Sequence, residues 1–171
     1  MARNRTIQLR VNGVDHEGTV EVRKTLSDFL REDLGLCGTN IGCEHGVCGA
    51  CTILMNGETV RSCLLLAVQA DGMELMTVEG LASPTGELHP IQQAFRDKHG
   101  LQCGFCTPGF LMTTYKLLQS NPNPSLEEIK EWLAGHLCRC TGYEDILESV
   151  KLAASRLRGE DITAQTQLKS S

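Results

Sequence analysis

The chain has 171 residues, of which 41% are hydrophobic, and this length suits one ordinary domain or two small ones. A net charge of −5, without a basic run or interleaved aromatic residues, argues against a nucleic-acid-binding protein. The longest apolar run, Cys63 to Val68, is too short to span a bilayer. No apolar segment follows the basic first residues, so no signal peptide is expected. In a chain expected in the cytoplasm, nine cysteines indicate metal or redox chemistry rather than disulfides.

The N-terminal part predicts a small mixed sheet packed on one helix. Two Asn-Gly pairs, at residues 12–13 and 56–57, are strong hairpin signals. A weak capping box at Thr25 begins a helix with apolar residues at helical spacing through Leu34, and Gly35 is expected to end it. The predicted strands cover residues 6–11, 14–22, 51–55, 58–61 and 73–78.

Beyond a linker rich in small and turn residues, the pattern becomes helical. Pro90 suits the first position of one helix, Thr107 and Pro108 open a second, and Ser125 begins a capping box for a third. A further capping box, Thr141 to Glu144, predicts a fourth helix that reaches about residue 158. Four such helices with short connections suggest a compact bundle. The residues after this helix are polar and aperiodic, and we expect them to be disordered.

The richest stretch of the chain is the ten residues from Gly42 to Cys51, which hold three cysteines and three glycines. Cys43, Cys48 and Cys51 are spaced C-x4-C-x2-C, and Cys63 follows at a distance; this is the plant-type ferredoxin spacing for a 2Fe-2S cluster. Such a loop must point backbone N–H groups at anionic sulfur, and glycines let the backbone come close. A disulfide-rich or zinc loop is the alternative, but the four cysteines and the interleaved glycines favour a cluster.

A second cysteine set lies in the helical part. Cys103 and Cys106 form a C-x2-C pair, and Cys138 and Cys140 follow more than thirty residues later. Each pair precedes a predicted helix start, so both helix N-termini should point free N–H groups and positive dipole ends at this set. A four-cysteine zinc site uses the same kind of pair, so this set alone leaves cluster and zinc open. The neighbouring ferredoxin-type loop favours a second cluster.

Other candidate residues give weaker indications of function. Cys37 is left over from both sets, and we expect a partly buried thiol that is not a ligand. His45 lies inside the first loop, but a Rieske site needs two histidines. The sequence shows no nucleophile–base arrangement, and its glycines lack dinucleotide-binding spacing. We therefore expect no substrate chemistry on this chain alone.

Four stretches together resemble the iron–sulfur subunit of the molybdenum hydroxylases, the xanthine oxidase family, which includes carbon monoxide dehydrogenase and bacterial N-heterocycle and aldehyde oxidoreductases. The resemblance covers about residues 5–155, and the stretches are residues 42–52, 61–63, 102–109 and 137–143. It implies an α+β fold with a ferredoxin-like (β-grasp) domain followed by a four-helix bundle domain. The implied parts are a 2Fe-2S domain at 1–80, a linker at 81–89, a helical 2Fe-2S domain at 90–159 and a disordered tail at 160–171.

The resemblance further implies an electron-transfer subunit of a multi-subunit oxidoreductase. Substrate would be hydroxylated at a molybdenum centre on a large partner subunit, and electrons would pass through two clusters here to FAD on a medium subunit. Molybdenum would be bound to a molybdopterin, the pterin cytosine dinucleotide. A dimer of heterotrimers is expected in the cytoplasm, with any membrane contact made through the partners. The chain looks like the free-subunit form of the family.

Carried over by position, the resemblance implies roles for individual residues. Gln102 and Cys140 would lie closest to the pterin, with Cys140 also a cluster ligand. His136 stands where Asn is usual, Asn40 where a basic residue is common, and Cys37 where Thr is common, but no ligand is removed. The implied ligands are Cys43, Cys48, Cys51 and Cys63 for the cluster nearer FAD, and Cys103, Cys106, Cys138 and Cys140 for the cluster nearer molybdenum.

Two other hypotheses belong to different classes of protein. A free-standing ferredoxin-like carrier would not need the second domain. A structural zinc-binding interaction module would use the same cysteines without redox chemistry.

Overall fold

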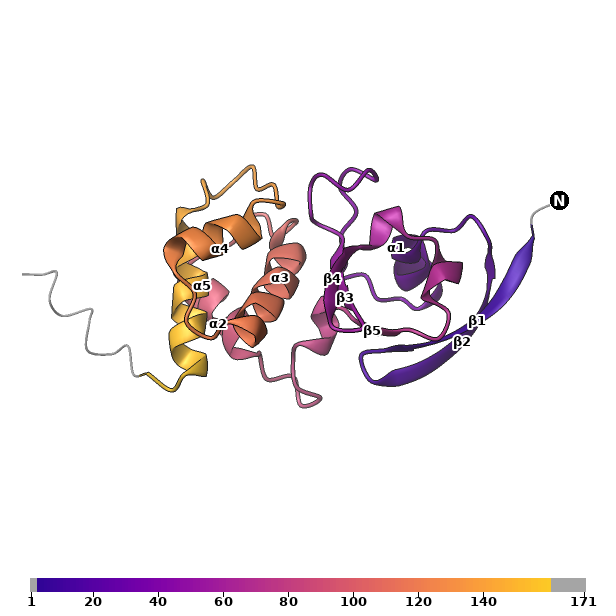
Figure 1. Ribbon diagram of the computed structural model, residues 1–171, viewed down its shortest axis with the longest axis horizontal. Helices are drawn as coiled ribbons and strands as arrows, with labels where there is room; N and C mark the ends of the chain where they lie inside the picture. Colours follow the sequence, from indigo (N-terminus) through magenta and orange to yellow (C-terminus); the bar gives the residue numbers. More distant parts are fainter. Residues whose placement is uncertain (1–2, 161–171) are drawn as a thin grey trace, which may run out of the picture.

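The computed structural model describes residues 3–160, in which a sheet part and a helical part lie side by side along the long axis (Figure 1). The sheet has five strands in the order β2-β1-β5-β3-β4, with β1 parallel to β5 and the other neighbours antiparallel. The predicted mixed sheet is therefore confirmed. Its strands are β1 Asn4–Val11, β2 Val14–Glu21, β3 Thr52–Met55, β4 Glu58–Arg61 and β5 Glu74–Met76.

Both predicted hairpins have the backbone that their Asn-Gly pairs favour. Asn12 and Gly13 have φ angles of 52° and 80°, and Asn56 and Gly57 have φ angles of 50° and 81°. Two consecutive left-handed residues give a type I′ turn, whose twist matches that of the flanking strands. The turns thus fix the register of β1 with β2 and of β3 with β4.

The predicted first helix is present but is not regular. It begins as α1, Leu26–Asp28, where the Thr25 hydroxyl accepts from the Asp28 N–H, and it continues as a π-helical turn over Phe29–Asp33. The N–H of Leu34 bonds to the Phe29 carbonyl at 3.2 Å, and Gly35 follows with a φ of 69°, as expected for a helix stop. The sequence pattern did not predict three short 3₁₀ turns. η2 Ser62–Leu64 and η3 Ala67–Ala70 lie between β4 and β5, and η4 Val78–Gly80 follows β5.

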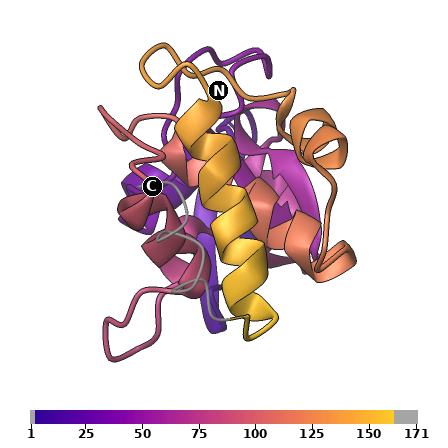
Figure 2. The ribbon, with the colours of Figure 1, turned by 90° about the vertical axis from the view of Figure 1, so that its left-hand side faces the viewer.

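All four predicted helices of the second part form, and Figure 2 shows α5 crossing the outer face of this part. Pro90 is the first residue of its helix, and Ser125 forms a capping box with Glu128. The helices are α2 Pro90–Asp97, α3 Thr107–Ser120, α4 Leu126–Leu133 and α5 Glu144–Leu157.

The predicted capping box at Thr141 is wrong. Helix α5 begins only at Glu144, and its N-cap is Tyr143, which has a left-handed φ of 72°. The Thr141 hydroxyl accepts from the Tyr143 N–H at 3.2 Å and lies 3.2 Å from the sulfur of Cys138. Thr141 therefore stabilises the turn that carries the cysteines, rather than the end of the helix.

The two parts have separate cores that meet at β3. Successive residues of a strand point to opposite faces, so Ile53 enters the core of the sheet part and Leu54 enters the core of the helical part. Helix α3 packs directly on β3. The two cysteine-bearing parts thus share a packed boundary.

No helix within residues 3–160 is long and apolar enough to cross a membrane. Of the tail predicted to be disordered, Glu160 belongs to the described chain, where its N–H bonds to the Ser155 carbonyl at 3.0 Å. Residues 161–171 lie outside the described part, so that prediction stays open there.

Candidate metal centres

The loop from Gly42 to Cys51 folds back on itself through residues in the left-handed region. Glu44, Gly46 and Gly49 have φ angles of 57°, 83° and 77°. Left-handed residues within a short loop turn successive backbone N–H groups toward a common side, where they form an anion-binding concavity. The loop therefore has the backbone that anionic sulfur requires.

Cys43 lies in this concavity. The Cys48 N–H donates to the Cys43 sulfur at 3.4 Å, and this bond, together with one from the His45 N–H, lowers the pKa of the Cys43 thiol to about 6. A thiol that ionises easily is a good metal ligand, because metals bind the thiolate. The His45 ring nitrogen interacts with the Cys43 carbonyl rather than with a sulfur.

The other two predicted ligands of this set lie deeper. Cys51 and Cys63 are 1% and 7% exposed. Burial, followed by contact with the Cys51 thiol, raises the pKa of Cys63 to about 12. Burial also raises the pKa of Cys48, whose thiol contacts that of Cys43. The closest thiol contacts of this set therefore pair Cys43 with Cys48 and Cys51 with Cys63, and weaker charge interactions link the two pairs.

The glycines of this loop leave no room for side chains, which tests whether the loop fits a cluster. A Cβ on Gly42 would lie 3.1 Å from the Cys48 sulfur, and a Cβ on Gly46 would lie 2.5 Å from Cδ1 of Leu64. The backbone must therefore approach the sulfurs closely, as a cluster-wrapping loop does. The donor set of four thiols and the backbone around it both fit a 2Fe-2S cluster.

The second set is also brought together as two pairs. The sulfurs of Cys103 and Cys140 lie 3.5 Å apart. Burial and contact with the Cys138 thiol raise the pKa of Cys106 to about 12. Burial opposes ionisation of Cys138, but the Thr141 hydroxyl and nearby N–H groups outweigh it, and the pKa of Cys138 is lowered.

The expectation that two helices begin at this second set holds for only one of them. Cys106 is the N-cap of α3, so the free N–H groups of that helix face the set. Helix α5 begins at Glu144, and the turn of Thr141 to Tyr143 separates it from Cys140. Part of the stabilisation of anionic sulfur at the second set therefore comes from polar groups of this turn and not from a helix dipole.

The two pairs of the second set differ in exposure. Cys103 and Cys140 are exposed, and so is the neighbouring Gln102, whereas Cys106 and Cys138 are partly buried. Gln102 and Cys140, the predicted pterin contacts, are thus both exposed.

Hydrogen bonds join the segments of the two sets. The N–H of Leu137, next to Cys138, donates to the carbonyl of Cys48 at 3.0 Å. The Asn40 side-chain amide donates to the Phe105 carbonyl at 2.9 Å, which joins the loop before Cys43 to the loop before Cys106. In Figure 1 the loop after α1 and the loop between α4 and α5 lie along the same edge of the molecule.

His136 lies at this junction and is 3% exposed. Burial, followed by repulsion from the Arg61 guanidinium, lowers the pKa of His136 to about 4. Its imidazole is therefore neutral near pH 7. The sequence marked His136 only as a departure from a family pattern, and nothing in its local spacing predicted its position between the two parts.

Cys37 is exposed, so the expectation of a partly buried thiol is wrong. Its neighbour in space is the Arg31 carbonyl, 3.8 Å from the sulfur, while the Arg31 guanidinium donates to the carbonyls of Cys37 and Thr39. These bonds pull the backbone toward the first helix and leave the thiol outside. Cys37 takes part in none of the four thiol pairs.

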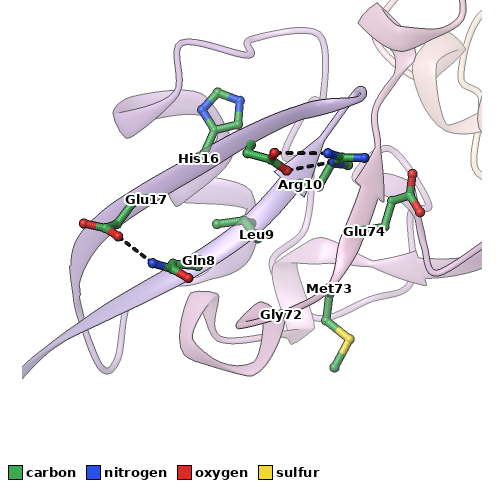
Figure 3. Close-up of a pocket in the computed structure, with 9 residues that line it drawn as sticks. Gln8, Leu9, Arg10, His16, Glu17, Gly72, Met73 and Glu74 are labelled. Carbon is green, nitrogen blue, oxygen red and sulfur yellow. Dashed lines mark hydrogen bonds and ion pairs between the residues drawn. The ribbon is translucent and has the colours of Figure 1, made fainter.

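A pocket of about 550 Å³ lies away from the cysteines, between the β1–β2 hairpin and the start of β5 (Figure 3). Four of its polar side chains are paired with one another: Arg10 pairs with Asp15 at 2.7 Å, and Gln8 donates to Glu17 at 2.6 Å.

The fold and the thiol sets define an iron–sulfur protein, and comparison with known proteins agrees. Residues 9–78 match the family model described as a 2Fe-2S iron-sulfur cluster binding domain, and residues 77–151 match the one described as a [2Fe-2S] binding domain. The chain is similar to the nicotine 6-hydroxylase small subunit of Paenarthrobacter nicotinovorans, with 56% identity over 84% of this chain and 86% of that protein.

Two further comparisons agree. The chain is 55% identical to the caffeine dehydrogenase subunit gamma of Pseudomonas sp. (strain CBB1), over 85% of this chain and 88% of that one. Its structure resembles quinoline 2-oxidoreductase from Pseudomonas putida 86, with a TM-score of 0.86 and 49% identity over 92% of this chain and 99% of that one. The chain belongs to the iron–sulfur small subunits of the molybdenum hydroxylase family and serves electron transfer in an oxidoreductase.

Proposed function

We propose that the chain holds two 2Fe-2S clusters and relays electrons from a molybdopterin-bearing large subunit to FAD on a medium subunit. The cluster of Cys103, Cys106, Cys138 and Cys140 receives them, and the cluster of Cys43, Cys48, Cys51 and Cys63 passes them on. The observation that carries this proposal is the hydrogen bond from Leu137 to the Cys48 carbonyl, which joins the two sets through one backbone contact.

The matched domain families support clusters over zinc, because both are described as 2Fe-2S binding. A single zinc ion needs four ligands that converge at one point, about 2.3 Å from each sulfur. The thiol pairs of each set are also compatible with a two-iron cluster in which each iron takes two cysteines.

Exposure supports the order of the two clusters. Gln102, Cys103 and Cys140 form an exposed edge at which a partner's cofactor can come close, and we assign this edge to the pterin. We also assign residues 1–80 and 90–159 to two domains, the second a four-helix bundle, joined by 81–89. The complex would be a dimer of heterotrimers, with the substrate bound by the large subunit.

Co-expression with the FAD-binding and molybdenum-binding subunits tests this proposal. We expect the three chains to co-purify in equal amounts and substrate to bleach the iron–sulfur absorption of the complex. The control is the same complex with Cys37→Ser, which should behave identically because Cys37 lies outside both sets. A chain that purifies alone with its clusters and exchanges electrons with soluble partners would instead be a free-standing carrier.

A further inference from the structure

His136 contacts both parts of the molecule through one ring nitrogen. Its Nε2 lies 3.2 Å from the hydroxyl of Thr52 on β3 and 3.1 Å from the hydroxyl of Thr113 on α3. Both threonines are buried, at 1% and 4% exposure. The imidazole therefore bridges the sheet part and the helical part in a place from which water is excluded.

The surrounding bonds determine which ring nitrogen carries the proton. The Thr52 hydroxyl donates its only hydrogen to the Gly49 carbonyl at 2.6 Å, and its oxygen also accepts from the Arg61 guanidinium. A hydroxyl has one hydrogen and two lone pairs, so toward His136 Thr52 can only accept. The Nε2 of His136 is thus the donor, and Nδ1 keeps a lone pair that has no partner.

The ring also fills the space between the cysteine segments. A Cβ on Gly49, which follows Cys48, would lie 2.6 Å from Cδ2 of His136. A Cβ on Gly109, three residues after Cys106, would lie 2.2 Å from the Gly49 carbonyl oxygen. His136 itself is two residues before Cys138. Segments of both thiol sets are therefore packed around one imidazole.

Arg61 strengthens the same junction from the sheet side. Its guanidinium donates to the Gly135 carbonyl at 2.8 Å and to the Thr52 hydroxyl, and Arg61 is two residues before Cys63. Hydrogen bonds shielded from water hold their partners in one arrangement where they are satisfied, and here Thr52, the Arg61 guanidinium and Nε2 of His136 all have partners. The network thus ties the backbone of the first set to that of the second.

We infer that His136 is a positioning residue that fixes the separation and relative orientation of the two clusters. This inference rests on the proposed two-cluster function and goes beyond it, because it assigns control of cluster-to-cluster exchange to a side chain that binds no iron. Electron exchange between two centres weakens steeply as they move apart, so a junction that loosens slows exchange although every cysteine remains.

The test uses the full chain with its clusters and two kinds of variant. Thr113→Val removes the α3 acceptor with little change of shape, and His136→Leu removes the donor. Thr114→Val is the matched control, because Thr114 is buried on the same helix and its hydroxyl has no hydrogen-bond partner. His136→Gln should rescue the contact, since its amide nitrogen can take the place of Nε2.

The readouts are iron content and the magnetic interaction between the two reduced clusters in EPR spectra. We expect Thr113→Val and His136→Leu to keep about four irons per chain, as two 2Fe-2S clusters require. We expect the interaction to be weakened in both variants and unchanged in Thr114→Val and His136→Gln. The double variant of His136→Leu with Thr113→Val should add little to His136→Leu, because both act on the same bond.

An unchanged interaction in fully loaded His136→Leu and Thr113→Val would overturn the inference. If His136→Leu loses iron, the magnetic interaction measured in Thr113→Val decides the test, since that variant leaves the imidazole in place. Failure of the two-cluster proposal would look different, because the unaltered chain would then lack one of the two EPR signals.

Discussion

Replacing Cys140 by serine should stop substrate from reducing the first cluster, the one assigned to Cys43, Cys48, Cys51 and Cys63, at a normal rate in the assembled complex. A chemical reductant should still reduce that cluster. Cys140 belongs to the exposed thiol pair of the second set, with its sulfur 3.5 Å from that of Cys103. The change should therefore remove the second cluster or shift its potential. Metal binding of this kind is coupled to folding, so the helical part should also loosen.

Rapid mixing of the variant complex with substrate measures this effect. The first cluster should survive, because its four cysteines all lie in the sheet part and keep their own N–H donors. EPR of the dithionite-reduced variant should show its signal unchanged. Normal substrate-driven reduction of that cluster would mean that electrons take another route, and the assigned order of the two clusters would be wrong.

The second large effect, a loss of iron from the first cysteine set, is expected from Cys48→Ser. Cys48 supplies one thiol of the first set and the N–H that donates to the Cys43 sulfur. The substitution keeps that N–H but replaces the soft sulfur ligand, so the first cluster should be lost or bound weakly. Iron should fall from about four per chain to about two.

The matched control is Cys37→Ser, which changes the same atoms at an exposed position outside the thiol pairs. It should keep the full iron content and an unchanged visible spectrum. The backbone bond from Leu137 to the Cys48 carbonyl survives in Cys48→Ser, so the second cluster should remain. Loss of a cluster in Cys37→Ser, or full iron in Cys48→Ser, would contradict the ligand sets.

Features set by neighbouring residues could be predicted from the sequence. The two Asn-Gly turns, the caps at Thr25 and Ser125, and the four helices all follow from local conformational preference, and the structure contains them. The spacing of the cysteines likewise grouped thiols that lie close together in the structure, while their role as metal ligands stays a prediction.

Features that depend on residues far apart could not be predicted. His136 meets Thr52 across 84 positions, and the Leu137–Cys48 bond joins two loops from different parts of the chain. Thr141 has the sequence of a helix cap, but the left-handed Tyr143 delays the helix to Glu144. A local pattern cannot show which of several partners a side chain will find once the chain has folded.

Three glycines in the sequence are a sign of the junction between the sheet part and the helical part, although their role was not predicted. Gly49, Gly109 and Gly135 all lie beside cysteine segments, and each would collide with the opposite part if it carried a Cβ. Glycines at such positions indicate close approach of two backbones. Their partners become evident only in the folded structure.

The most direct measurement of the two-cluster proposal is the content of iron, acid-labile sulfide and zinc in the purified chain, together with EPR of the reduced protein. Two complete thiol sets predict about four irons and about four sulfides per chain, little zinc, and two distinct 2Fe-2S signals. About two of each, a single signal, or zinc in place of iron at either set would contradict it.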